Sequence, residues 1–89
     1  MNAVLVSVII PTFNRLESLA NCLKALENQV DCKEKWEVII VNDGGIDIAS
    51  VVESSSKLLN IKPFYQNNYG PAKARNYGVE NARGKIVAF

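Results

Sequence analysis

The chain has no histidine and only two cysteines among its 89 residues. Cys22 and Cys32 do not have the spacing of a metal-ligand pair, so the sequence excludes a structural zinc site within these residues. The absence of histidine likewise excludes a histidine general base in this segment. We expect both thiols to be free in a reducing cytoplasm, because disulfides form mainly in oxidising compartments.

A charge excess and a long apolar run are also missing. The ten Lys and Arg residues nearly cancel the nine Asp and Glu residues, so nothing favours a nucleic-acid partner or an anionic membrane. Residues 4–10 form the longest apolar stretch, interrupted by Ser7 and followed by Pro11, whereas a spanning helix needs about 20 residues. The stretch has no basic flank and no small-residue cleavage site, unlike a secretory signal. We expect a cytoplasmic location and no transmembrane segment in this chain, with membrane association of the full-length protein left open.

Short β-branched runs alternate with helical patterns along the chain. Strands are predicted at residues 4–10, 37–41, 61–65 and 85–89. The first two are short β-branched runs without clean polar alternation, as expected for parallel strands buried on both faces. Apolar residues recur at helical spacing between them. Right-handed crossovers then give an α/β fold, a Rossmann-like parallel sheet in the order 3-2-1-4 with helices on both faces.

The helix boundaries follow from capping chemistry. Asn14 is predicted to cap the first helix, with Glu17 completing a capping box, and Asp47 is predicted to cap the second. Serines at 54–56 weaken the middle of that second helix. Pro71 suits the first turn of the third helix and Gly84 its C-terminal stop. The residues predicted to follow Pro71 along that helix are Ala72, Arg75, Val79 and Ala82.

Ligands of such sheets bind at the carboxyl ends of the strands. The first strand is predicted to end at Pro11, and Phe13 follows in the loop. There its ring can stack on a base, a contact worth roughly 1–3 kcal/mol in nucleic-acid systems. The alternative is that Phe13 is a hydrophobic staple for the next helix. This loop has none of the glycines of a P-loop or a dinucleotide fingerprint, which disfavours both devices.

Two further segments reach the same edge. Asp43 follows the second strand, where its carboxylate can accept hydrogen bonds from the N–H edge of uracil or from ribose, unless the segment 42–45 is only a turn. Lys73 and Arg75 fall in the first turns of the third helix, where cations oppose the helix dipole. They suggest an anionic ligand, with Arg75 the better candidate because its planar fork binds oxygens in pairs, unless both are simply solvated.

Three motifs now stand together, residues 6–15 (VSVIIPTFNR), 38–45 (VIIVNDGG) and 68–78 (NYGPAKARNYG). Together they resemble the N-terminal half of the inverting family 2 glycosyltransferases. Those proteins show Pro-Thr-Tyr-Asn, then Asp-Asp-Gly-Ser, then Asn-x-Gly-x-x-x-Ala-Arg-Asn-x-Gly. The chain matches the third motif in full and the first with Phe13 in place of tyrosine. Asn42 and Gly45 depart from the second motif.

The resemblance implies a GT-A fold in which residues 1–89 are one partial domain, the half that binds the donor nucleotide. The full-length enzyme would transfer a sugar from a nucleoside-diphosphate sugar, commonly a UDP-sugar, to an acceptor hydroxyl, with a role in polysaccharide biosynthesis. The residues that would surround the nucleotide are Pro11, Thr12, Phe13, Asn14, Asp43, Asn68 and Arg75.

The same resemblance implies a divalent metal ion, Mn or Mg, and a catalytic carboxylate. We expect neither the metal ligands nor a catalytic residue within residues 1–89, because the strand at 85–89 would run directly into the acidic metal-binding motif. That strand would also lie at a sheet edge, which predicts a homodimer through it. A non-catalytic nucleotide-binding α/β module is the alternative function.

Other doubly wound proteins fit the sequence less well. A receiver domain would need an acidic pair near the end of the first strand, where this chain has Ile9, Ile10 and Pro11. A nucleotidylyltransferase would need a glycine-rich loop after that strand.

Overall fold

The computed structural model describes residues 4–29 and 35–89. Within these residues, four strands alternate with three helices, as predicted. They are β1 (Val6–Thr12), α1 (Leu16–Glu27), β2 (Trp36–Asn42), α2 (Ala49–Ser55), β3 (Ile61–Tyr65), α3 (Pro71–Glu80) and β4 (Ile86–Ala88). Cys32, predicted to be a free thiol, lies outside the described residues.

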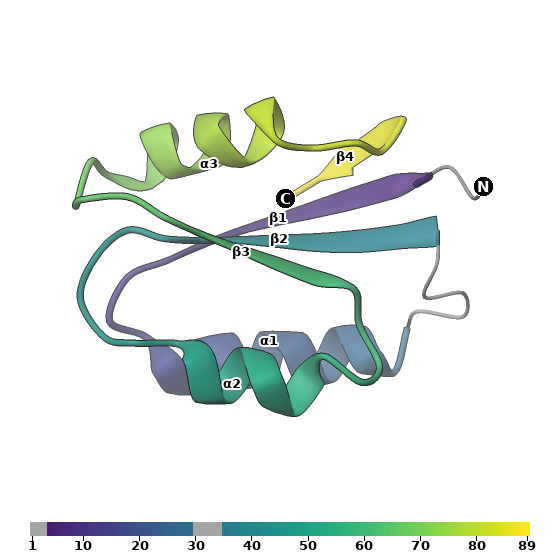
Figure 1. Ribbon diagram of the computed structural model, residues 1–89, viewed down its shortest axis with the longest axis horizontal. Coiled ribbons are helices and arrows are strands. Elements are labelled where there is room, and N and C mark those ends of the chain that lie inside the picture. The colour runs from purple at the N-terminus through teal and green to yellow at the C-terminus, as the bar shows by residue number, and fades with distance from the viewer. Residues whose placement is uncertain (1–3, 30–34) are drawn as a thin grey trace.

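The sheet is parallel throughout, in the predicted order β3-β2-β1-β4. α1 and α2 cover one face of it, and α3 covers the other (Figure 1). Each face has its own apolar cluster. Leu19, Leu23, Val38, Ile40, Ile48 and Leu59 pack on the side of α1 and α2. Ile9, Ile39, Val41 and Ala74 pack beneath α3.

β1 continues through Pro11, so the predicted end of the strand is wrong. Pro11 is in register with Val41 of β2, and the strand ends one residue later at Thr12. β4 pairs with β1 only from Val6 to Val8, so at Pro11 the strand has a single described neighbour. Proline has no backbone N–H to donate, and it is tolerated where a strand has a neighbour on one side, as at Pro11.

Neither of the two predicted helix caps is the N-cap residue in the structure. The capping box at α1 is wrong, because Arg15 is the N-cap residue and its side chain makes no capping hydrogen bond. Asn14 adopts φ 52° and turns its side chain toward Ile46 instead. The predicted cap of α2 is wrong as well, because Ile48 is its N-cap residue; Asp47 precedes it and accepts a hydrogen bond from the N–H of Ala49 at 3.0 Å. α2 then ends within the serine run, at Ser55.

α3 begins at Pro71, as predicted. Ala74 and Gly78 are the buried residues of this helix. A Cβ atom on Gly78 would lie 2.5 Å from Cγ2 of Ile9, so the absent side chain lets α3 pack closely on the sheet. Gly84 does not end the helix, which stops at Glu80; a Cβ at Gly84 would lie 2.7 Å from the backbone nitrogen of Ser7.

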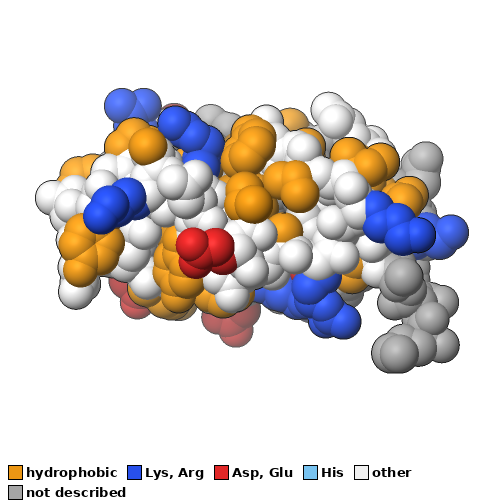
Figure 2. Space-filling view, turned by 90° about the horizontal axis from the view of Figure 1, so that it is seen from above, with side chains coloured by type: hydrophobic (Ala, Val, Ile, Leu, Met, Phe, Trp, Pro, Cys, Tyr) orange, Lys and Arg blue, Asp and Glu red, His pale blue; other side chains and the backbone are white. Residues whose placement is uncertain are grey.

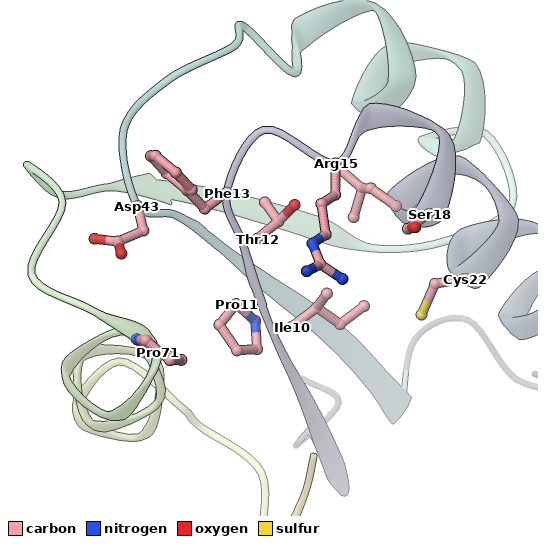
Figure 3. A pocket seen from close by; sticks show the side chains of 10 residues that line it. Ile10, Pro11, Thr12, Phe13, Arg15, Ser18, Cys22, Asp43 and Pro71 are labelled. Carbon is pink, nitrogen blue, oxygen red and sulfur yellow. The ribbon is translucent and has the colours of Figure 1, made fainter.

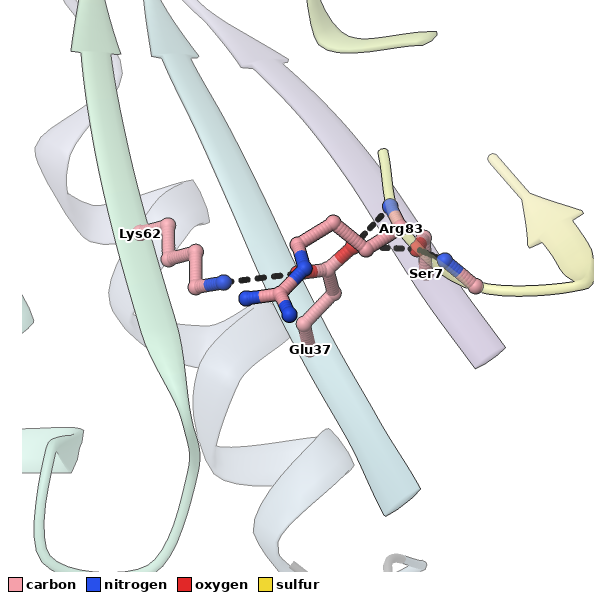
Figure 4. A network of polar contacts seen from close by, with 5 residues as sticks. Ser7, Glu37, Lys62 and Arg83 are labelled. Atoms are coloured by element: carbon pink, nitrogen blue, oxygen red, sulfur yellow. Dashed lines mark hydrogen bonds and ion pairs between the residues drawn. The ribbon is translucent and has the colours of Figure 1, made fainter. Parts of the chain in front are cut away.

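A buried carboxylate ties three strands to the loop after α3 (Figure 4). Glu37 is fully buried near the start of β2 and accepts hydrogen bonds from the Ser7 hydroxyl and from the N–H of Arg83, the latter at 2.6 Å. Nζ of Lys62 forms an ion pair with it at 3.1 Å. The N–H of Gly84 donates in turn to Oγ of Ser7 at 2.8 Å. Burial acts to raise the pKa of Glu37, but the hydrogen bonds and the lysine charge outweigh it and hold the pKa below its usual value.

Candidate functional site: a pocket at the carboxyl ends of β1 and β2

A cavity of about 490 Å³ opens where β1 and β2 end. In Figure 3, β1 crosses the cavity, with the α1 side chains on one side and Asp43 and Pro71 on the other. The residues that line it are Ile10, Pro11, Thr12, Phe13, Arg15, Ser18, Leu19, Cys22, Asp43 and Pro71. The cavity thus combines an aromatic ring, apolar side chains and one charge of each sign.

Phe13 presents a free aromatic face in this cavity. It is 41% exposed, an unusual environment for a phenylalanine, and the preceding residue, Thr12, is largely buried. β1 holds Thr12 in register with Asn42, which fixes the start of the loop that carries the ring. The geometry therefore offers a flat apolar surface to a ligand.

The Asp43 carboxylate is buried, 4% exposed, and is held by the loop between β3 and α3. Its Oδ1 atom accepts hydrogen bonds from Nε2 of Gln66 and from the N–H of Tyr69, both at 2.7 Å. Its Oδ2 atom accepts one from the N–H of Gly70 at 2.9 Å. Burial acts to raise the pKa of Asp43, but these hydrogen bonds outweigh it and lower the pKa, so the group is ionised at neutral pH.

The loops after β1 and β2 are joined by Asn14. Its Oδ1 atom accepts a hydrogen bond from the N–H of Ile46 at 2.8 Å. Gly45 adopts φ 84°, and a Cβ there would lie 2.1 Å from the same oxygen, so only glycine fits this contact. Asn42 supports the second loop by donating to the carbonyl of Ile46 at 3.0 Å.

The structure brings four of the seven predicted site residues together. Pro11, Thr12, Phe13 and Asp43 all line the cavity. Asn14 follows Phe13 in the chain and joins the loops after β1 and β2 through its hydrogen bond with Ile46. The other two do not line the cavity. Asn68 is exposed with φ 52° in the loop that Asp43 holds, and Arg75 is exposed on α3.

Sequence reasoning missed several residues of the site. Arg15, Ser18 and Cys22 also line the cavity. Ser18 and Cys22 are four residues apart on α1 and so lie on the same face of the helix, which is the signal in the sequence that could have found them. Gln66 was missed because its partner Asp43 is distant in the sequence. A second cavity of about 570 Å³ lies between the end of β3 and α3, with Tyr65, Tyr69 and Tyr77 among its walls.

The described residues do not form a metal centre. Within residues 4–29 and 35–89, no group of three or more His, Cys, Asp and Glu side chains could hold a metal ion. Asp43 is the acidic residue lining the main cavity, and three donors already occupy it. No helix in the described part of the chain is long and apolar enough to cross a bilayer.

The sequence and the fold both match glycosyltransferases. The profile of glycosyl transferase family 2 matches residues 7–89, and the chain belongs to this family. It is 40% identical over 85 residues to an uncharacterized glycosyltransferase of Rickettsia bellii, and the alignment covers 94% of this chain and 12% of that protein. It is 39% identical over 88 residues to the validoxylamine A glucosyltransferase of Streptomyces hygroscopicus subsp. jinggangensis, covering 96% of this chain and 21% of that protein.

Solved structures confirm the predicted GT-A fold. Residues 1–349 of S. aureus TarS, crystallised with UDP and with UDP-GlcNAc, superpose with a TM-score of 0.84 at 34% identity, over 93% of this chain and 25% of that one. The mannosyltransferase PcManGT of Pyrobaculum calidifontis, in complex with GDP-Man and Mn2+, gives 0.82 at 26% identity, over 98% of this chain and 27% of that one. The chain thus spans about a quarter or less of the length of these relatives.

Proposed function

We propose that this chain binds the nucleotide of a UDP-sugar and forms the donor half of an enzyme that transfers the sugar to an acceptor hydroxyl. The observation that carries the proposal is the exposed ring of Phe13 beside the buried Asp43 carboxylate in one cavity at the strand ends. Stacking on the ring and a hydrogen bond to the carboxylate are the two contacts that a base needs. The complexes of TarS with UDP and UDP-GlcNAc support this assignment.

The other predicted residues have supporting places in this proposal. Pro11 and Thr12 form the floor of the cavity beside the base, and Asn14 holds the Phe13 loop. Asn68 and Arg75 approach the nucleotide from the loop after β3 and from α3. A divalent cation, as in the PcManGT complex, would be held by residues outside the described part of this chain.

The test is nucleotide binding by variants of Phe13. Titrations of UDP, GDP, dTDP and CDP, with and without Mn²⁺, should show binding of UDP to the chain. Phe13→Ala should weaken UDP binding roughly tenfold, the size expected for loss of one stacked aromatic, whereas Phe13→Tyr should retain it. Tyr65→Ala is the control, because Tyr65 is also an exposed aromatic residue but does not line this cavity. No binding of any nucleotide, or equal losses in the Phe13 and Tyr65 variants, would contradict the proposal.

We also propose that the chain forms a homodimer through β4. This strand pairs with β1 on one side, and the side chains of Ile86, Val87 and Phe89 are 55%, 38% and 71% exposed. Figure 2, which looks onto the face covered by α3, shows apolar side chains between groups of Lys and Arg. An apolar strand edge is a template for pairing with a second chain. Light scattering over a concentration series should show a dimer that Val87→Lys dissociates and the control Val79→Lys on α3 does not; a monomer at all concentrations would refute it.

A further inference from the structure

Gln66 lies directly after β3 and contacts the carboxylate proposed to bind the base. Its Nε2 atom donates to Oδ1 of Asp43 at 2.7 Å and to the carbonyl of Gly70 at 3.3 Å. Gln66 does not line the main cavity, so any effect that it has on a ligand there must pass through Asp43.

The hydrogen bonds to Asp43 can be counted against its capacity. An ionised carboxylate offers about four lone-pair sites, two on each oxygen. Gln66 and the N–H of Tyr69 take both sites of Oδ1, and the N–H of Gly70 takes one site of Oδ2. One site on Oδ2 is left for a ligand. Asp43 can therefore accept one strong hydrogen bond from a base and not a pair.

We propose that Gln66 is a specificity-determining residue that positions Asp43 to accept a single donor and so favours uracil over guanine. The inference rests on the proposed function. Uracil presents one imide N–H, which the free site on Oδ2 satisfies. Guanine presents its ring N–H and its exocyclic amino group side by side, and satisfying both requires both carboxylate oxygens. With Oδ1 occupied by Gln66, guanine keeps a buried donor without a partner, which costs affinity.

The backbone donors alone do not exclude guanine in this way. Tyr69 and Gly70 hold Asp43 through backbone N–H groups, so two of the three hydrogen bonds that position the carboxylate remain when Gln66 is changed. Removal of Gln66 frees one site on Oδ1. The adjacent pair of acceptor sites then matches the paired donors of guanine.

The experiment compares the ratio of UDP to GDP affinity in the unchanged chain and in three variants. Gln66→Met keeps the length of the side chain without its donor, and Gln66→Ala is a second variant in case the first does not fold. Asn67→Ala is the control, because Asn67 is an exposed neighbouring amide. Calorimetric titrations give the four ratios, and thermal unfolding establishes that each protein is folded.

We expect the unchanged chain and Asn67→Ala to favour UDP, and the Gln66 variants to reduce that preference about tenfold, the effect of one recovered hydrogen bond to a charged group. If the Gln66 variants lose UDP and GDP affinity equally, Gln66 only holds the loop and the inference is overturned. An unchanged ratio of UDP to GDP affinity without any loss would overturn it too. Binding of UDP with no change of ratio leaves the proposed function intact. Failure of the unchanged chain to bind either nucleotide would refute the proposed function, and this inference with it.

Discussion

Replacement of Glu37 by alanine is expected to lower the free energy of unfolding by about 3–5 kcal/mol, the usual result of removing one partner of a buried ion pair. The hydroxyl of Ser7 and the N–H of Arg83 lose their acceptor in the variant, while Lys62, which is 32% exposed, can turn to water. A small domain has only about 5–15 kcal/mol of stability in total, so this loss is large. Urea unfolding at neutral pH measures it.

Two further variants sharpen this test. Glu53→Ala removes an exposed glutamate from α2 and should change stability by less than about 0.5 kcal/mol. Glu37→Gln keeps one acceptor oxygen but places an NH₂ group against the surrounding donors. Its loss of stability should therefore lie between those of Glu37→Ala and Glu53→Ala. Equal stability of the Glu37 and Glu53 variants would show that the buried network contributes nothing.

The same carboxylate gives stability a defined pH dependence. The pKa of Glu37 in the folded chain lies below its ordinary value of 4.5. Its contribution is therefore fully present above that ordinary value and is lost as the pH falls through the lower folded-state pKa. The difference in stability between the unchanged chain and Glu37→Gln should shrink on acidification below about pH 4.5.

Asp43→Asn should weaken UDP binding by roughly ten- to a hundredfold, the range for loss of a hydrogen bond to a charged group. An asparagine has one acceptor oxygen in place of two, so its NH₂ group must face the donors of either Gly70 or of Gln66 and Tyr69. The loop after β3 then shifts, and the acceptor presented to the base is lost with it. Isothermal titration with UDP measures the change.

Asp47→Asn is the matched control for this substitution. Asp47 accepts a hydrogen bond from Ala49 outside the cavity, and asparagine can make the same bond. It should leave UDP affinity unchanged. Equal UDP affinity of the Asp43 variant and the unchanged chain would reduce Asp43 to a turn residue.

The strand order and the location of the site were predictable from the sequence, because both depend on patterns within short segments. Runs such as residues 37–41 show their buried, parallel character directly, and topology then brings Phe13 and Asp43 to one edge. The missed features depend on contacts between distant segments. Asn14 has the residue type and spacing of a helix cap, yet its oxygen binds the N–H of Ile46.

The burial of Glu37 and the packing at Gly78 also depend on contacts between distant segments, so the local sequence does not show them. Glu37 gives no local sign of burial, because its partners Ser7, Lys62 and Arg83 come from β1, β3 and the loop after α3. On α3, the apolar Val79 is exposed, and the sheet packs against Gly78. Gly78 faces the sheet because only a residue without a side chain lets α3 approach β1 this closely.

The two polar clusters of the molecule lie at opposite ends of β2. Glu37 stands near its beginning and Asp43 directly after its end, about 20 Å apart along an extended strand. Sites this far apart with no shared partner make nearly additive contributions. The rim can therefore diverge in evolution, or be randomised at Thr12, Phe13, Arg15 and Ser18, while the distal carboxylate preserves the melting temperature. Substitutions at the cavity therefore require no compensating mutation around Glu37.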